Sequence, residues 1–268
     1  MSTFKSQKFA VLRRASRVWA IASVHGEADR LKRLHAEIRD RFQPGDRLVY
    51  LGNIMGRGPA VHETIDALLS FRIAVLAQPG IFACDVAILR GRQEEMWQKL
   101  LQLQFAAEPR QVLTWMLDQG LASTLEAYGG DAQEGLRAAS SGAVHLTRWT
   151  GKLRQAMKAC AGHFEVLTSL RRAAFTDDGG LLFVSAGLDP GRPLEAQKDS
   201  FWWSNQSFAE MTEPYYGFRR VVRGFDRKHP GLDLSAHGAT LDGGAGFGGP
   251  LLAACFLPDG EVGDLLEA

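Results

Sequence analysis

The chain has 268 residues, 46% of them hydrophobic and 23% charged, which is enough to bury the core of one large α/β domain or two small ones. Lysine and arginine total 31 against 30 acidic residues, so the net charge of +1 gives no overall attraction to nucleic acid or to an acidic membrane. The three cysteines are too few for a disulfide framework or a cysteine-based zinc site, and we expect a reducing, cytoplasmic location.

The first sixteen residues form a basic segment that could be disordered, with four lysine and arginine residues. No apolar stretch of signal-peptide type follows them, and no later apolar run is long enough to cross a membrane. We therefore expect neither a signal peptide nor a membrane span. The folded part is predicted as one domain over residues 17–268.

Strand and helix patterns alternate through the first third of the chain. Residues 17–24 are an apolar, β-branched run that predicts a buried strand, and leucine and isoleucine then recur at helical spacing over 27–41. The same alternation continues with a strand at 47–51, a helix at 61–71 and a strand at 86–89. Such β-α-β units favour a sheet with parallel members.

The middle of the chain is different in character. Residues 94–172 are mostly helix-like, and we predict a helical insertion at about 97–172. Strand character returns at 181–184, and the stretches 220–223 and 251–256 are predicted as antiparallel strands joined by glycine-rich turns.

Three loops that follow the predicted strands carry distinctive glycine-rich sequences. Residues 22–26 read Ala-Ser-Val-His-Gly, residues 52–59 read Gly-Asn-Ile-Met-Gly-Arg-Gly-Pro, and residues 91–95 read Gly-Arg-Gln-Glu-Glu. In order and spacing they resemble the motifs Gly-Asp-x-His-Gly, Gly-Asp-x-x-Asp-Arg-Gly and Gly-Asn-His-Glu of the calcineurin-like metallophosphoesterases. The resemblance is to the branch that contains bacterial serine/threonine protein phosphatases and diadenosine-tetraphosphate hydrolases.

Later stretches resemble the same family in the same order, namely 115–129, 183–197, 221–225 and 240–250. The likeness thus covers residues 18–262. It implies an α/β fold of four layers, in which two mixed β-sheets are flanked by helices, and it implies a bacterial source.

In that family two divalent metals share a bridging carboxylate, and a metal-bound hydroxide attacks the phosphorus. The resemblance places the metal ligands at Ser23, His25, Asn53, Arg92, Ser185 and Phe225. Only His25 keeps the family's residue type. Asn53 cannot share a negative charge between two cations, Phe225 has no ligand atom, and a permanent cation at Arg92 stands where a cation should bind.

The acid–base residues of the family are also replaced. Its catalytic histidine corresponds to Gln93, which cannot release a proton near neutral pH, and the aspartate that orients this histidine corresponds to Gly56. We therefore predict a pseudophosphatase, a non-catalytic binding, scaffold or regulatory module that needs no cofactor and holds no stoichiometric manganese, iron or zinc.

The alternative is an active phosphoesterase with a displaced or reduced site. This site would hold one or two divalent metals (manganese, iron or zinc) through His25 and polar residues of the C-terminal third. The candidate polar residues are Asp226, His229, His237 and Asp242. Residues of this kind in glycine-rich loops also serve as turn formers.

The old cleft could still bind an anion without metal. Arg57 matches the family's phosphate-contacting arginine, Arg92 adds a second cation, and His25 lies on a neighbouring loop, while backbone N–H groups after Gly26 and Gly58 would add donors at helix starts. Two structural alternatives compete with this hypothesis. The arginines could pair with Glu94, Glu95 or Asp29, and His25 could cap the next helix or hydrogen-bond to a carbonyl.

The expected partner is a protein, which could be phosphorylated, and neither nucleic acid nor a membrane. Its identity, the pathway and the oligomeric state are left open. The helical insertion and the aromatic stretch 201–216 are predicted to form the partner-facing surface, because aromatic residues are enriched at the centres of interfaces. The same tryptophans could equally be interior.

Overall fold

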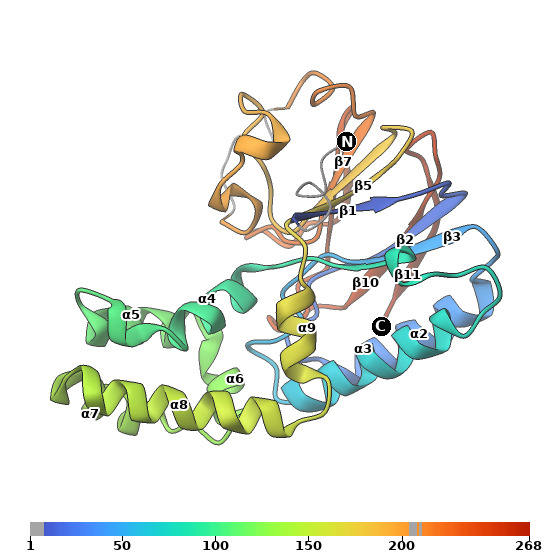
Figure 1. The fold of residues 1–268 in the computed structure, drawn as a ribbon. Coiled ribbons are helices and arrows are strands. Elements are labelled where there is room, and N and C mark those ends of the chain that lie inside the picture. Colours follow the sequence, from blue (N-terminus) through green and yellow to red (C-terminus); the bar gives the residue numbers. More distant parts are fainter. Residues whose placement is uncertain (1–7, 204–207, 209–210) are drawn as a thin grey trace.

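Two mixed β-sheets flanked by helices form the molecule in the computed structural model, which describes residues 8–203, 208 and 211–268 (Figure 1). This arrangement confirms the predicted fold class. Within the described ranges, no helix combines the length and the apolar character needed to cross a membrane.

The first sheet contains the predicted β-α-β units. Its strands, in spatial order, are β11 (Val262–Glu267), β10 (Leu252–Phe256), β2 (Arg17–Ile21), β3 (Asp46–Tyr50) and β4 (Val86–Ile88). The pairs β2–β3 and β3–β4 are parallel, and β10 joins β2 in the antiparallel direction. Every residue of β3 and β10 is buried, and burial on both faces explains the continuous apolar run of β10. In β3 three apolar residues follow the buried, charged Asp46 and Arg47.

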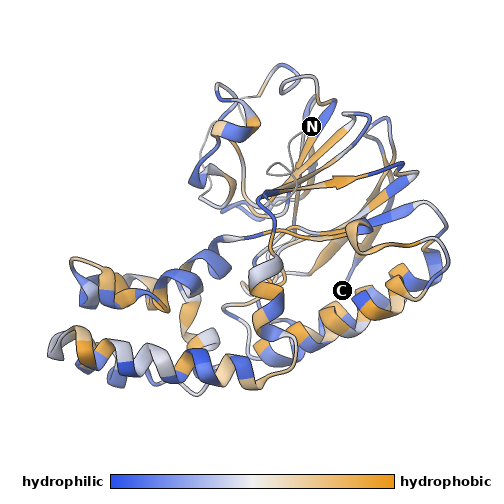
Figure 2. Cartoon of the chain, in the orientation of Figure 1, coloured by the Kyte–Doolittle hydropathy of each residue, from blue (hydrophilic) through white to orange (hydrophobic). Residues whose placement is uncertain are grey.

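Helices α2 (Ala28–Arg41) and α3 (Val61–Leu76) lie side by side against the first sheet (Figure 1). Leu31, Leu34 and Ile38 of α2 are fully buried at the spacing that a single apolar face requires. Figure 2 shows the resulting pattern, in which hydrophobic residues recur along both helices between hydrophilic ones. The two helices were expected at these places, although α3 continues beyond its predicted end at residue 71.

The second sheet has six strands, in the spatial order β1 (Phe9–Leu12), β5 (Ala173–Thr176), β6 (Leu181–Val184), β7 (Arg220–Arg223), β9 (Gly238–Asp242) and β8 (Gly231–Leu234). The prediction that β7 is antiparallel to its neighbours is wrong, because β7 pairs in the parallel direction with both β6 and β9. The four residues Arg-Val-Val-Arg carry no information about strand direction, and the long segment that joins β6 to β7 allows the chain to return to the same edge.

The N-terminal segment contributes a strand to this sheet. Phe9–Leu12 pairs in parallel with β5, and the side chains of Phe9 and Leu12 are buried. The folded region therefore begins ahead of the expected start at residue 17. The remainder of the basic segment, residues 1–7, lies outside the described residues.

The two sheets meet at a shared hydrophobic core, where the ring of Phe183 on β6 lies edge-on to Phe256 on β10 with centroids 6.0 Å apart. A smaller core covers the other face of the six-stranded sheet, and it includes Trp202 and Tyr215. Parts of the predicted aromatic surface are thus interior, whereas Tyr216 is 60% exposed. Residues 204–207 and 209–210 of that stretch lie outside the described residues.

The helical insertion projects to one side of the sheets (Figure 1). It contains α4 (Arg92–Leu100), α5 (Pro109–Met116), α6 (Ala122–Ala127), α7 (Ala132–Ser141), α8 (Ala143–Ala159) and α9 (His163–Ser169). Between α5 and α6 a π-helical turn, Leu117–Leu121, contains Gly120 with a φ of 95°. The carbonyl of Gly120 accepts a hydrogen bond of 2.9 Å from the Arg57 N–H, which holds the insertion against the loop after β3.

Candidate functional site

The loops at the carboxyl ends of β2, β3, β6 and β7 meet at one end of the two sheets. The Ser23 N–H donates to the Gly224 carbonyl over 3.1 Å, and the Gly224 N–H donates to the Ser185 carbonyl over 2.9 Å. The His25 N–H donates to the Asn53 carbonyl over 2.7 Å. Positions that the resemblance aligns with the family's metal ligands are therefore brought together, because the carboxyl ends of parallel strands share one edge of a sheet.

The backbone of these loops is tightly constrained. His25, Asn53 and Arg57 all have φ near +50°, in the left-handed region that non-glycine residues seldom occupy. A Cβ atom at Gly58 would collide with the His25 carbonyl, and one at Gly91 would collide with the Asn53 nitrogen. Glycine at these two positions is needed for the loops to approach one another.

The side chain of Asn53 is fully engaged within the protein. Its Nδ2 donates a hydrogen bond of 3.1 Å to Ser23 Oγ, and its Oδ1 accepts one of 3.0 Å from the Gln93 N–H. Neither residue carries a charge, and the Oγ of Ser185 is also neutral. This donor set does not fit a pair of divalent cations, which require bridging and terminal carboxylates.

Gln93 and Gly56 occupy complementary space at the position of the family's general acid. A Cβ at Gly56 would lie 2.5 Å from Gln93 Oε1, so the glutamine packs where an aspartate side chain would begin. Gln93 Nε2 donates to the Gln119 carbonyl over 2.9 Å. Neither residue has a proton that it can transfer near neutral pH.

The acids proposed as ion-pair partners of the arginines bind elsewhere. Glu94 accepts backbone hydrogen bonds from Gly91, Asn53, Ile54 and Met55, at 2.7–3.2 Å. Glu95 pairs with Arg90 at 2.9 Å, and Asp29 pairs with Lys32 at 3.6 Å. The predicted alternative in which Glu94, Glu95 or Asp29 neutralises the arginines is therefore wrong.

Arg57 and Arg92 instead pack against aromatic rings. The guanidinium carbon of Arg57 lies 4.0 Å from the centre of the Phe247 ring, and that of Arg92 lies 5.2 Å from the centre of Phe225. Neither arginine forms an ion pair with any residue that the structure describes. Burial lowers the pKa of both, and the pKa of Arg92 falls to about 10 with further contributions from Arg57 and Arg227.

His25 is buried and uncharged. Its ring lies edge-on to Phe225 and Phe247, with centroids 6.0 and 5.5 Å away. Burial, together with the nearby charges of Arg57 and Arg92, lowers its pKa to about 3. Because neither ring nitrogen has a hydrogen-bond partner among the described residues, the prediction that His25 caps a helix or binds a carbonyl is wrong.

A cavity of about 390 Å³ opens beside these residues. It is lined by Arg57, Arg92, Trp115, Gln119, Trp203, Phe225, Arg227, His229 and Phe247. The described lining thus contains three arginines and no acidic residue, and the rings of Trp115 and Trp203 pack together with centroids 5.7 Å apart. His25 does not line the cavity, so its predicted contact with a bound anion is not supported by the geometry.

Sequence reasoning missed the contribution of the insertion to this cavity. Trp115 lies in the last turn of α5, and Gln119 lies in the following turn, where Gly120 with its φ of 95° interrupts the helix. The periodic pattern of the sequence does not predict where this interruption places the two side chains.

The first backbone donors after Gly26 and Gly58 are used within the protein. The Glu27 N–H donates to the Val24 carbonyl, and the Ala60 N–H donates to the Gly26 carbonyl.

The polar residues of the C-terminal third do not form the alternative metal site. His229 Nδ1 lies 2.9 Å from Asp242 Oδ2, which also accepts a hydrogen bond of 2.8 Å from the Asp226 N–H. Asp226 pairs with Arg223, and His237 contacts only the backbone carbonyl of Arg219. Within the described ranges these residues do not bring three ligand atoms to metal-binding distance of one another.

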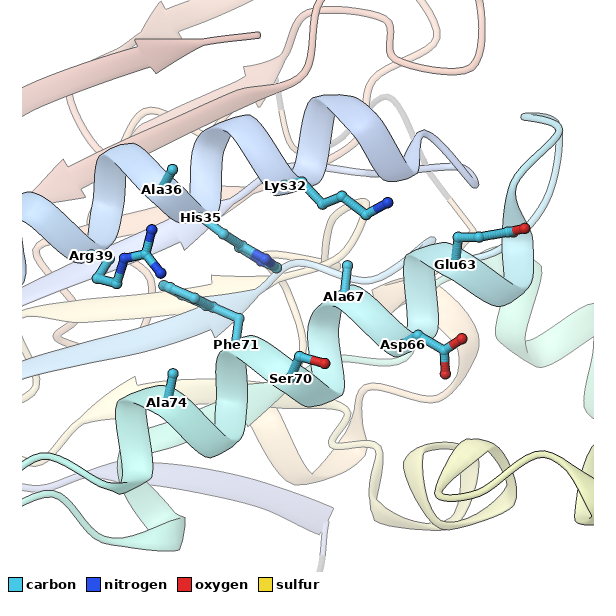
Figure 3. A pocket seen from close by; sticks show the side chains of 10 residues that line it. All are labelled: Lys32, His35, Ala36, Arg39, Glu63, Asp66, Ala67, Ser70, Phe71 and Ala74. Carbon is cyan, nitrogen blue, oxygen red and sulfur yellow. The ribbon is translucent and has the colours of Figure 1, made fainter.

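A separate groove of about 470 Å³ lies between α2 and α3 (Figure 3). The histidine at its base, His35, hydrogen-bonds to the Tyr50 hydroxyl at 2.9 Å and stacks on Phe71. Both ring contacts are internal, and burial lowers the His35 pKa to about 3. This histidine therefore stabilises the packing of α2 and α3 on the sheet.

No protein-family model matches this chain, and no curated protein sequence matches it. Solved structures of similar architecture do exist. A protein assigned as a diadenosine tetraphosphatase is 18% identical, with 98% of each chain covered and a TM-score of 0.57. The cold-active protein-tyrosine phosphatase of a psychrophilic Shewanella is 14% identical, over 99% of this chain and 85% of that one, with a TM-score of 0.54.

A protein serine/threonine phosphatase from Saccharomyces cerevisiae is 12% identical, over 99% of this chain and 84% of that one, with a TM-score of 0.53. Identities this low establish a shared fold alone. They confirm the metallophosphoesterase-like fold that the glycine-rich loops predicted.

Proposed function

We propose that this protein is a catalytically inactive, metallophosphoesterase-like binding module that recognises a phosphate group in its cleft without metal. The proposal depends chiefly on one observation. Arg57 and Arg92 are desolvated guanidinium groups beside a cavity, and no carboxylate of the described chain pairs with them.

The chemistry of the loops supports the lack of catalysis. A two-metal phosphoesterase needs charged ligands for its cations and a group that protonates the leaving oxygen. The corresponding positions hold the hydrogen-bonded pair Ser23 and Asn53 and the neutral Gln93. Asn53 thus binds Ser23 and the Gln93 backbone, and none of these three residues offers a carboxylate to a cation.

The charge of the cleft supports an anionic ligand. Burying an unpaired cation costs free energy, and a bound anion offsets that cost. A guanidinium group presents parallel N–H donors that match two phosphate oxygens. Arg57, Arg92 and the exposed Arg227 line the same cavity, so a dianionic phosphate would meet positive charge from three directions.

The aromatic lining indicates what the phosphate is attached to. Trp115 is 44% exposed and Phe247 is 41% exposed, and both stand at the cavity together with the arginines. Apolar rings beside an anion site suit a phosphorylated side chain of a protein, whose carbon atoms can pack on them. A phosphorylated protein is accordingly the partner that we propose.

Isothermal titration calorimetry with inorganic phosphate and with one peptide in phosphorylated and unphosphorylated form tests the proposal. The phosphopeptide should bind the wild type and lose at least about tenfold in affinity in the Arg57→Ala/Arg92→Ala variant. The matched control is Arg33→Ala/Arg39→Ala, two exposed arginines on α2, which should bind like the wild type.

Hydrolysis of p-nitrophenyl phosphate, measured with and without added manganese, tests the inactive state separately. We expect no turnover above the rate of buffer alone. Equal phosphopeptide binding by the wild type and the cleft variant, no binding by either, or manganese-dependent hydrolysis that the cleft variant loses would each overturn the proposal.

A further inference from the structure

Three side chains of metal-ligand type converge outside the cleft, where α3 meets the helical insertion. The ligand atoms of His62, Cys160 and His163 all lie within 4.8 Å of one another. Cys160 Sγ lies 3.9 Å from His62 Nε2. Among the residues that the structure describes, no other group of three or more histidine, cysteine or acidic residues is compact enough to hold a metal ion.

The local sequence explains why these residues meet. His62 and Asp66 are four residues apart in α3 and therefore share one face of the helix. Cys160 directly follows α8, and His163 begins α9, so a turn of two residues brings them together. Asp66 projects from α3 (Figure 3), and its Oδ1 lies 3.1 Å from His163 Nε2.

We propose that His62, Asp66, Cys160 and His163 bind one zinc ion. Two imidazoles, a thiolate and a carboxylate make a four-ligand set of the kind that zinc accepts, whereas magnesium and calcium avoid thiolates. In a tetrahedral zinc site neighbouring ligand atoms lie about 3.3–3.6 Å apart, given the usual zinc–ligand distances. The pairs at 3.1 and 3.9 Å are already close to that spacing.

A neighbouring tyrosine is placed to orient one ligand. The Tyr128 hydroxyl lies 2.8 Å from His163 Nδ1, and both groups are buried. If Nδ1 carries the hydrogen and donates it to Tyr128, the lone pair of Nε2 faces the cluster. Second-shell hydrogen bonds of this kind fix the tautomer of metal-binding histidines.

The same geometry also allows a metal-free arrangement, in which the hydroxyl of Tyr128 donates to His163 and Nε2–H donates to Asp66. That arrangement gives His62 and Cys160 no strong hydrogen bond among the described residues. The contact between them is 3.9 Å long, and the Cys160 thiol donates a 3.5 Å contact to the Ala156 carbonyl. A bound ion explains the close approach of His62, Cys160 and His163, and Asp66, which contacts His163, would complete the set.

A zinc ion here would fasten the insertion to the sheet layer. It would join the α8–α9 turn to the first turn of α3, the helix that follows the loop of Asn53 and Arg57. The same insertion supplies Trp115 and Gln119 to the cleft. The sequence predicted no cofactor and no stoichiometric zinc, so the proposed site departs from that prediction.

Cobalt(II) is the probe that tests the site, because it replaces zinc and reports a thiolate ligand by an intense near-ultraviolet charge-transfer band. Chelator-treated protein should bind about one cobalt ion per chain and show this band, and zinc should displace it. Cys160→Ala should abolish the band. Cys84→Ala, which removes an exposed cysteine elsewhere, should keep it.

Zinc should also raise the melting temperature of the wild type and of Cys84→Ala but not of Cys160→Ala. Circular dichroism establishes that each variant is folded. A folded wild type without the thiolate band, or a band that persists in Cys160→Ala, overturns the zinc site. A metal site in the cleft would bind cobalt in both cysteine variants without a thiolate band. Failure of the zinc-site proposal therefore leaves the proposed function of the cleft to be tested separately.

Discussion

Asn53 Nδ2 lies 3.1 Å from Ser23 Oγ and donates a hydrogen bond to it. The resemblance assigns both positions to metal-binding aspartates, and here they bind each other. Asn53 Oδ1 accepts a further hydrogen bond from the Gln93 N–H, so both polar ends of this buried side chain have a partner within the protein. The two side chains thus form a neutral contact between the loops.

Metal binding should return only when the whole ligand set is restored. The combined variant carries Ser23→Asp, Asn53→Asp, Gly56→Asp, Arg92→Asn, Gln93→His, Ser185→His and Phe225→His. It should bind manganese in calorimetry, in a Cys160→Ala background that removes the proposed zinc site, whereas Asn53→Asp alone should not. Gly56→Asp alone should destabilise the fold, since its Cβ would lie 2.5 Å from Gln93 Oε1. Manganese binding by Asn53→Asp alone would contradict this prediction.

Replacing Arg92 with methionine should stabilise the protein in phosphate-free buffer. Methionine keeps the apolar contact with Phe225 and removes a buried, unpaired cation, for a gain of about 1–3 kcal/mol in the free energy of unfolding. The folded pKa of Arg92 is lowered to about 10, so the unfolded state binds more protons above pH 10. Wild-type stability should therefore rise as pH increases through 10, and Arg92→Met should lack this rise.

Urea denaturation at pH 7 and pH 10.5 measures both effects. Arg33→Met, at an exposed position on α2, is the control and should leave stability unchanged. A loss of stability in Arg92→Met would reveal an anionic partner for Arg92 and so count against a free anion site.

His25 should make the protein sensitive to acid. Its folded pKa of about 3 is below the ordinary histidine value of about 6.5, so between these values the unfolded state binds a proton that the folded state rejects. Stability should fall with decreasing pH in this window, by up to about 1.4 kcal/mol per pH unit from this residue. His25→Asn, which tolerates the left-handed backbone, should weaken that dependence.

The measurement is urea denaturation at pH 7 and pH 5, with His145→Asn as the exposed control. Because His35 shares the lowered pKa, the variant should retain part of the acid sensitivity. Identical pH profiles for the wild type and His25→Asn would show that His25 is protonated or exposed in the folded protein.

Glu94 should be essential for stability even without catalysis. Its two oxygens accept backbone hydrogen bonds from four N–H groups of the surrounding loops. Glu94→Gln would turn an amide toward some of these donors, at a cost of about 2–4 kcal/mol in the free energy of unfolding. The exposed Glu63→Gln on α3 should cost close to nothing. A neutral effect of Glu94→Gln in thermal or urea melts would refute this assignment.

Trp115 should increase the affinity of the cleft for phosphates that carry an apolar group. It lines the cavity while 44% of it is exposed, so Trp115→Ala removes an apolar wall and no charge. Affinity for phenyl phosphate or a phosphopeptide should fall by about 3–10-fold, which corresponds to about 1 kcal/mol, and affinity for inorganic phosphate should not change. Phe105→Ala, an exposed aromatic elsewhere in the insertion, is the control. An equal loss for phosphate would mean that Trp115 acts by shaping the site.

Some features of the cleft could be read from local sequence. The helix expected at 27–41 is observed at Ala28–Arg41, because leucine and isoleucine at helical spacing need only one face to be buried. Gly58 and Gly91 predicted tight loops, and the collisions that a Cβ would cause there explain why glycine is required. Arg57 and Arg92 were expected near one cleft, and they line one.

Other features depended on contacts between distant parts of the chain. Neither the binding of Glu94 to backbone N–H groups nor the packing of His25 among phenylalanine rings follows from their own neighbours in sequence. The direction of β7 is another example, since it is set by the path of the preceding segment.

The order of strands and helices, the glycine-rich character of the loops and the lack of aspartate at their aligned positions are properties of neighbouring residues, so they could be predicted from the chain alone. Three features required the folded molecule: the arginines have no ion-paired acid among the described residues, Trp115 joins them at the cavity, and His62 meets Cys160 and His163. Such meetings depend on how helices and sheets pack after the chain has folded, and side chains separated by a hundred residues carry no local signal of their eventual distance.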